Sequence, residues 1–152
     1  MNLRVRTWLV ILLLLVASAP STARELLIAR SPAAFAEAML ALQESIRKHG
    51  YHLSRVQRVD VGLTTSGFKT DKYRVVFFGR PDEIHRLGHA YPDLVPYLPL
   101  KIAIFAEGDQ TLLVAANPAL LKRFYHHPKL APVFDRWARD VQTILDDVRT
   151  AE

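Results

Sequence analysis

The chain has 152 residues, of which 50% are hydrophobic and 23% charged, and its formal net charge is +5. These proportions are typical of one compact domain and exclude a disordered chain. Because the chain has no cysteine, the sequence also excludes disulfides, lipid attachment through cysteine, thiolate nucleophiles, cysteine-ligated metals and haem attachment through C-x-x-C-H. The fold must therefore depend on its hydrophobic core.

Residues 1–23 have the order of a cleavable export signal. Arg4 and Arg6 precede an apolar run from Trp8 to Ala17. Both Ala17-Ser18-Ala19 and Ser21-Thr22-Ala23 then offer the small-x-Ala pattern of a cleavage site, and we favour cleavage after Ala23. The apolar run is only about half as long as a membrane span, which argues against the alternative of an uncleaved anchor. We therefore expect a periplasmic or secreted protein of the bacterial envelope, with residues 24–152 as a single domain and no stable membrane span.

The charge of the exported part also limits its partners. The export signal carries two arginines and no acidic residue, so its removal lowers the formal net charge from +5 to +3. A value this small suits a soluble protein and does not indicate a nucleic-acid partner.

The first expected elements are a strand and a helix. Residues 25–30 form a short apolar run of strand length, and Ser31-Pro32 is typical of an N-cap followed by proline at the first helical position. Phe35, Met39, Leu42 and Ile46 then recur at helical spacing, and Gly50 ends the pattern.

A hairpin with a long loop is predicted next. Val59, Val61 and Leu63 alternate with Asp60 and Gly62, which indicates a strand with one buried face that begins somewhere after Tyr51. The polar stretch 64–71 follows as the loop, and residues 73–78 are rich in the β-branched and aromatic residues of a second strand.

The rest of the chain predicts a helix, a hairpin and two further helices. Pro81 begins a short helix, and residues 101–107 and 111–116 form a hairpin around the turn Gly108-Asp109. Asn117-Pro118 opens a short helix, and a final helix covers about residues 132–149.

The expected order is β-α-β-β-α-β-β-α-α, which predicts an α+β fold with an antiparallel sheet of about five strands and helices packed on one face. On this model the first helix packs on a sheet face that includes four aliphatic residues, namely Val59, Val61, Ile102 and Ile104.

Three segments carry a family resemblance. Residues 73–81 read YRVVFFGRP, residues 98–105 read LPLKIAIF, and Asn117-Pro118 follows. Together they resemble the family catalogued as domain of unknown function 302, over about residues 28–121. The resemblance implies a small α+β domain of the TATA-binding-protein-like sheet class, often a homodimer, with no established activity; it implies no nucleic-acid binding, since function resides in sites and not in folds.

A histidine pair is the first candidate site. His85 and His89 lie four residues apart on the expected Pro81 helix and so point the same way, which would let them share one metal ion. His126 and His127 could serve as further ligands if the fold brings them close to His85 and His89. The alternative is a solvated helix face, because no strict motif such as H-E-x-x-H is present.

A group of cations is the second candidate site. Lys69, Lys72 and Arg80 lie near the 64–71 loop and the start of the Pro81 helix, whose free amides favour an anion. We expect a small carboxylate or phosphate to bind there. Asp82 and Glu83 would weaken such a site, and the alternative is a sheet edge guarded by charge.

Three functions stay open at this point: a ligand-binding or accessory module of the envelope, a metal-binding or metal-handling protein acting through the histidine pair, and an enzyme of unknown chemistry. The sequence has no nucleophile elbow and no phosphate-binding glycine-rich loop. We therefore favour the binding module; the sequence indicates no particular cofactor.

Overall fold

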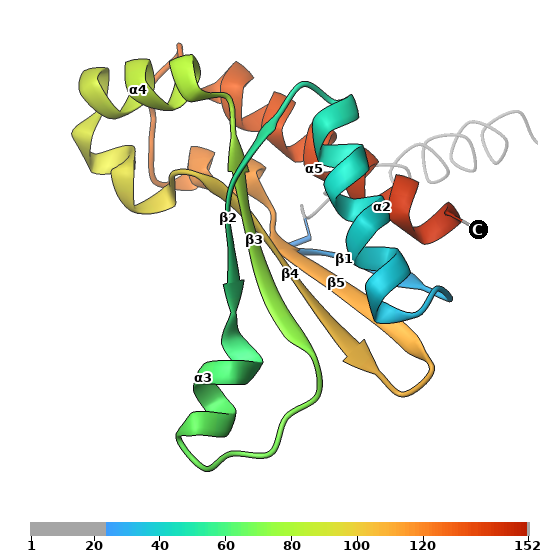
Figure 1. Ribbon diagram of the computed structural model, residues 1–152. Coiled ribbons are helices and arrows are strands. Elements are labelled where there is room, and N and C mark those ends of the chain that lie inside the picture. The colour runs from blue at the N-terminus through green and yellow to red at the C-terminus, as the bar shows by residue number, and fades with distance from the viewer. Residues whose placement is uncertain (1–23, 152) are drawn as a thin grey trace, which may run out of the picture.

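Five antiparallel strands form one sheet in the order β1-β5-β4-β3-β2 (Figure 1). The computed structural model describes residues 24–151. The strands are β1 (Leu26–Ser31), β2 (His52–Arg58), β3 (Tyr73–Gly79), β4 (Leu100–Glu107) and β5 (Gln110–Ala116). The helices are α2 (Phe35–Lys48), α3 (Val59–Thr65), α4 (Pro81–Ala90) and α5 (Ala131–Thr150), with short 3-10 helices η1 (Pro92–Tyr97) and η2 (Pro118–Arg123). The predicted export signal, residues 1–23, lies outside the described residues.

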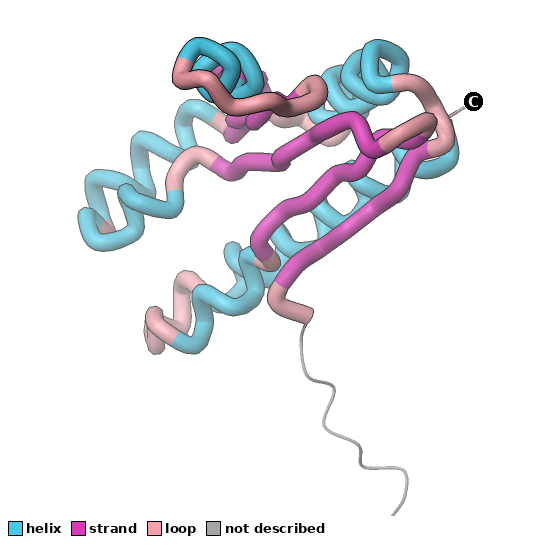
Figure 2. The backbone as a smooth tube through the Cα atoms, turned by 90° about the horizontal axis from the view of Figure 1, so that it is seen from below, coloured by secondary structure: helices cyan, strands magenta, loops and turns pink. Residues whose placement is uncertain are grey.

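The core lies between the sheet and the two long helices, α2 and α5. Both helices lie on the same side of the sheet, and the tube view shows the strands as a separate layer (Figures 1 and 2). Leu42 and Ile46 of α2 are fully buried, as are Ile102 and Ile104 of β4. The fold is thus α+β, with a five-stranded antiparallel sheet and its main helices on one face, as predicted.

Helix α2 starts later than the sequence predicts. Ser31 is not an N-cap: it is the last residue of β1, pairs with Thr111 in the sheet, and its Oγ accepts a hydrogen bond from Ala33 N at 3.3 Å. The helix begins at Phe35 without a side-chain cap. At its other end Gly50 follows with φ +73°, a conformation that glycine adopts without steric cost, so the predicted stop is confirmed.

The strand predicted to begin after Tyr51 is present as β2, but its continuation through residues 59–63 is wrong, because these residues form helix α3. Val59 and Leu63 lie four residues apart and so share a helix face as readily as a strand face. The hydroxyls of Thr64 and Thr65 donate to the carbonyls four residues earlier at 2.8 Å, and Asp60 pairs with Arg74. Val61 is 44% exposed, and no residue of α3 is buried. The prediction that α2 packs on a sheet face containing Val59 and Val61 is therefore wrong.

The strand that pairs with β3 lies earlier, in β2. It forms the edge of the sheet and carries only two apolar residues, Leu53 and Val56, among polar ones. The β4–β5 hairpin and the α4 start at Pro81 are confirmed. Asn117 caps η2 as predicted, since its side chain accepts a hydrogen bond from Ala119 N at 3.0 Å.

The sheet face opposite α2 and α5, here called the outer face, is also apolar. One row across four strands joins Ile28, Val114, Ala103 and Val75, as the strand registers show. Ile28 is 55% exposed. Within residues 24–151, no helix is both long and apolar enough to cross a membrane.

Candidate ligand-binding pocket

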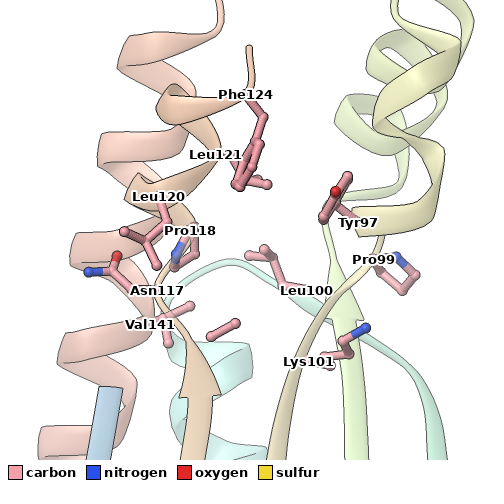
Figure 3. A pocket seen from close by; sticks show the side chains of 11 residues that line it. Tyr97, Pro99, Leu100, Lys101, Asn117, Pro118, Leu120, Leu121, Phe124 and Val141 are labelled. Carbon is pink, nitrogen blue, oxygen red and sulfur yellow. The ribbon is translucent and has the colours of Figure 1, made fainter. Parts of the chain in front are cut away.

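An apolar pocket of about 240 Å³ lies at the end of the sheet where β4 begins and β5 ends. One wall comes from η1 and the start of β4, and the other from η2 and α5 (Figure 3). The eleven lining residues are Tyr97, Pro99, Leu100, Lys101, Ala116, Asn117, Pro118, Leu120, Leu121, Phe124 and Val141. Most of this lining is carbon, so the pocket favours an apolar guest.

Prolines and one asparagine shape the two walls. Pro99 leads into β4, and Pro118 starts η2, where proline costs no helical hydrogen bond. Asn117 holds this start from both ends of its amide: Oδ1 accepts from Ala119 N at 3.0 Å, and Nδ2 donates to the Arg24 carbonyl at 2.8 Å. The walls are thus set by backbone geometry before any guest arrives.

A tyrosine joins the two walls of the pocket. The Tyr125 hydroxyl donates to the Asp93 carbonyl in η1 at 2.5 Å, although Tyr125 lies just past η2. Its ring meets that of Tyr97 edge to face, with centroids 6.0 Å apart. Phe124, by contrast, is 71% exposed beside the pocket. An exposed phenylalanine next to an apolar pocket enlarges the surface that a guest can cover.

The predicted anion-binding residues lie at two ends of the molecule. Lys69 is exposed in the loop before β3, and Lys72 lines a shallow hollow of about 440 Å³ together with Asp60 and Asp71. Arg80 follows the other end of β3, which places it roughly 25 Å from Lys72 at the usual rise of a strand. The structure therefore brings the two lysines to one region and leaves Arg80 outside it. Anion binding by the lysines stays a prediction.

Arg80 belongs instead to a cluster of charged side chains between β3, α4 and α5. Its guanidinium lies 4.5 Å from the ring centroid of Tyr51 and 3.7 Å from Asp140, and it donates to the His49 carbonyl at 3.2 Å. Burial raises the pKa of the Tyr51 hydroxyl, and the neighbouring Asp140 carboxylate raises it further. We call Tyr51, Arg80, Glu83, Arg136 and Asp140 the polar cluster.

The formal charges of the polar cluster sum to zero. Glu83, in the first turn of α4, pairs with Arg136 and accepts a hydrogen bond from Trp137 Nε1 at 3.0 Å. Arg136 also lies 3.8 Å from Asp140. Two arginines thus face two carboxylates, which favours a structural role that ties α5 to the sheet.

The histidine pair lies on the exposed surface of α4. His85 and His89 are both exposed, and His127 packs its ring edge against Tyr91 with centroids 5.0 Å apart. Nowhere in residues 24–151 do three or more histidine, aspartate or glutamate side chains gather as a metal-binding group. Metal binding by the pair alone stays a prediction.

Sequence reasoning did not find the pocket. Its walls come from segments some twenty to forty residues apart, and no local pattern joins them. The family resemblance was a signal of its position. Two of the three segments that carry the resemblance line the pocket, through Pro99, Leu100, Lys101, Asn117 and Pro118.

The chain is similar to proteins of one family. The model of the family described as domain of unknown function DUF302 matches residues 27–148. Among solved structures, the crystal structure of an uncharacterized conserved protein DUF302 from Bacillus stearothermophilus is similar, with a TM-score of 0.75 and 19% sequence identity. The match covers 84% of this chain and 100% of that chain. At this identity the likeness shows the fold alone. No curated protein matches the chain.

Proposed function

Since this chain belongs to the family described as domain of unknown function DUF302, we propose that it acts as a small binding module whose pocket takes a small, mostly apolar molecule. The observation that carries the proposal is the carbon-rich lining of the pocket between η1, η2 and α5. A concave apolar site with a few polar groups is the usual form of a small-molecule site.

The size of the pocket limits the guest. An engineered apolar cavity of about 150 Å³ is large enough to hold benzene. In proportion, the 240 Å³ of this pocket suits a guest of roughly ten non-hydrogen atoms. Most of the eleven lining residues are apolar, so the lining favours the binding of an apolar molecule.

The test is a titration with nonanol, an apolar chain of about ten non-hydrogen atoms, followed by backbone amide NMR. The proposal expects shifts at residues 97–101 and 116–124. Leu121→Trp should fill the pocket and abolish them, whereas Leu40→Trp, on the exposed side of α2, should leave them unchanged. Absence of binding by the wild-type protein, or shifts confined to other residues, would refute the proposal.

We further propose that the module works in the bacterial envelope, in the periplasm or outside the cell. This rests on the order of basic, apolar and small residues within residues 1–23. The intact mass of the protein recovered from its native envelope tests it. A mass that still includes residues 1–23 would contradict cleavage.

We also propose that two copies associate through the outer face. Leu26 and Ile28 are 49% and 55% exposed there, on a sheet whose other face is covered by α2 and α5. Five strands of six to eight residues present on the order of 500 Å² per copy, or about 1,000 Å² in total, which is the lower limit for a specific interface. Analytical ultracentrifugation should show a weak dimer that Ile28→Glu dissociates and Leu40→Glu does not; a monomer at all concentrations would refute it.

A further inference from the structure

Helix α3 and the loop after it project beyond the end of the sheet. The two views of the whole chain both show this segment reaching further than the β4–β5 turn (Figures 1 and 2). We call residues 59–72 the projection; none of them is buried. A segment that buries nothing contributes little to the hydrophobic core, so the apolar residues exposed on it need another explanation.

The projection holds an aromatic side chain in a fixed turn. Phe68 is 63% exposed. Its backbone N–H donates to the Leu63 carbonyl at 3.0 Å, and that of Gly67 donates to the Thr64 carbonyl, also at 3.0 Å. Gly67 has φ +87°, and the two hydrogen bonds are those of a Schellman motif, which ends a helix at a glycine. Phe68 is therefore presented to solvent by a defined turn.

The excess positive charge of the domain lies in and beside the projection. Residues 55–74 contain five cationic and two acidic side chains, which gives a net charge of +3. Residues 24–152 as a whole also have a net charge of +3, so the remainder of the domain is neutral. One of the two acids, Asp60, is already paired with Arg74. This end of the molecule therefore attracts anions.

Two lysines of the projection lie next to its exposed apolar side chains. Lys69 follows Phe68 directly in the chain. Lys72 and Val61, which is 44% exposed, line the same hollow of about 440 Å³. Within residues 24–151 neither lysine forms an ion pair, although Asp71 also lines that hollow. The projection thus combines apolar groups and unpaired cations at one end of the molecule.

We propose that the projection binds the surface of a membrane that contains anionic lipids, with the Phe68 ring at the boundary of headgroups and hydrocarbon and Lys69 against the lipid phosphates. Aromatic and aliphatic side chains enter that boundary, and nearby cations are attracted by anionic headgroups. A specific protein partner would instead need about 800 Å² on each side, whereas the projection exposes only two large apolar side chains. This binding is peripheral, and it does not depend on the pocket.

The expected strength follows from these two contributions. Each lysine near an anionic surface improves binding by about fivefold. Transfer of a phenylalanine ring out of water contributes about tenfold. Association should therefore be weak and reversible, and it should weaken further as salt is added, because added ions screen exposed charges.

Vesicle sedimentation tests the proposal with the protein recovered from its native envelope. Vesicles of phosphatidylcholine are compared with vesicles in which half of the lipid is phosphatidylglycerol. The variants are Phe68→Ser and Lys69→Gln. Their matched controls are Leu40→Ser, because Leu40 is 61% exposed on α2, and Lys129→Gln, because Lys129 is exposed before α5 and forms no ion pair with the described residues.

The wild type should bind the vesicles with phosphatidylglycerol about fivefold or more tightly than those without it. Phe68→Ser should weaken that binding about tenfold and Lys69→Gln about fivefold, whereas both controls should match the wild type. No binding by the wild type, equal binding to the two kinds of vesicle, or binding that both variants keep would overturn the proposal.

Two further measurements test the ring and the charge separately. In Phe68→Trp, which keeps an aromatic ring on the same turn, the added fluorescence should shift to the blue on the vesicles. Unshifted emission would show that the ring stays in water and would overturn its insertion. Glycerol phosphate without vesicles should leave the backbone amide NMR signals of residues 68–72 unchanged. Shifts there would assign Lys69 to a soluble anion and would overturn the membrane as its partner.

Discussion

The hydroxyl of Tyr51 donates a hydrogen bond of 2.5 Å to Asp140 Oδ2, and this bond joins the start of β2 to the middle of α5. The two residues lie 89 positions apart in the sequence. Tyr51 is only 2% exposed, so the bond lies at the edge of the core. Asp140 also lies within 4 Å of Arg80 and Arg136. Tyr51 thus donates an uncharged hydrogen bond to the same carboxylate that Arg80 and Arg136 approach.

Tyr51→Phe should lower the free energy of unfolding by about 1 to 2 kcal/mol, because a partly buried carboxylate loses a donor. The phenylalanine ring can keep the edge contact with Phe78, whose centroid lies 5.5 Å away, so the change isolates the hydroxyl. Urea unfolding measures the effect. Tyr73→Phe is the control, since the Tyr73 hydroxyl forms no hydrogen bond with the described residues; a similar loss in both variants would contradict this account.

Leu42→Ala should cost about 2 to 5 kcal/mol, the range for a leucine truncated in a packed core. Leu42 is fully buried between α2 and the sheet, whereas Leu40, two residues earlier on the same helix, is 61% exposed. Leu40→Ala should therefore change stability by no more than about 0.5 kcal/mol. Thermal or urea unfolding of the two variants compares the same chemical change on two faces of one helix. Equal effects would show that α2 buries a different face.

Asp147→Asn should remove a pH-dependent part of the stability. Ser45, His49 and Lys48 lie 2.9, 3.1 and 3.4 Å from Asp147 Oδ2, and the Ser45 hydrogen bond, followed by those of the other two, lowers the pKa of this carboxyl. A lowered pKa in the folded state stabilises the fold above the unfolded pKa, and the stabilisation is lost as the pH falls through the folded value.

The wild type should therefore exceed Asp147→Asn by about 1 to 2 kcal/mol at pH 7, and the difference should vanish in acid, below the folded pKa. Urea unfolding at a series of pH values measures the two curves. Asp109→Asn, in the β4–β5 turn, is the matched control because Asp109 forms no ion pair with the described residues. A difference between wild type and Asp147→Asn that does not depend on pH would rule out the proposed electrostatic cause.

Replacing Gly62 and Gly79 with alanine should change the stability of the fold in opposite directions. A Cβ at Gly62, within α3, would meet nothing within 4 Å, so Gly62→Ala should raise stability by up to about 1 kcal/mol through helix propensity. A Cβ at Gly79 would lie 2.2 Å from Ile84 Cδ1 and 3.1 Å from its Cγ1. Gly79→Ala should then cost about 1 to 3 kcal/mol, as overpacking does. Differential scanning calorimetry gives both signs, and a stabilised Gly79→Ala would mean that Ile84 moves aside freely.

The parts of the fold that sequence reasoning predicted are those where local pattern and tertiary packing agree. The face of α2, the β4–β5 hairpin and the Asn117 cap of η2 are of this kind. The edge strand β2 begins after Tyr51, as predicted, but its end was misplaced because an edge strand carries few apolar residues to mark it. The extension of this strand through Val59 and Val61 failed because residues four apart, such as Val59 and Leu63, share a face in a short helix as well as in a strand.

The site was less predictable than the fold, because its geometry depends on distant partners. The proximity of Lys69, Lys72 and Arg80 in the sequence suggested one site, yet β3 extends between the lysines and the arginine. Arg80 meets Asp140, a residue of α5 that no local pattern connects to it. In the same way Tyr97 and Val141 share the pocket only because α5 returns to the end of the sheet.

The pairing of β1 with β5 sets an order of events for a chain that emerges N-terminus first. The residues of β1 meet their partners Thr111–Ala116 only after roughly 80 further residues have appeared, which takes about 4 to 16 s at usual rates of synthesis. During that interval an apolar strand with Leu26, Leu27 and Ile28 has no neighbour in its own chain, and unpaired strands of this kind readily join other edges. The first strand of the chain is therefore protected from such pairing only by the arrival of the chain's own C-terminal half.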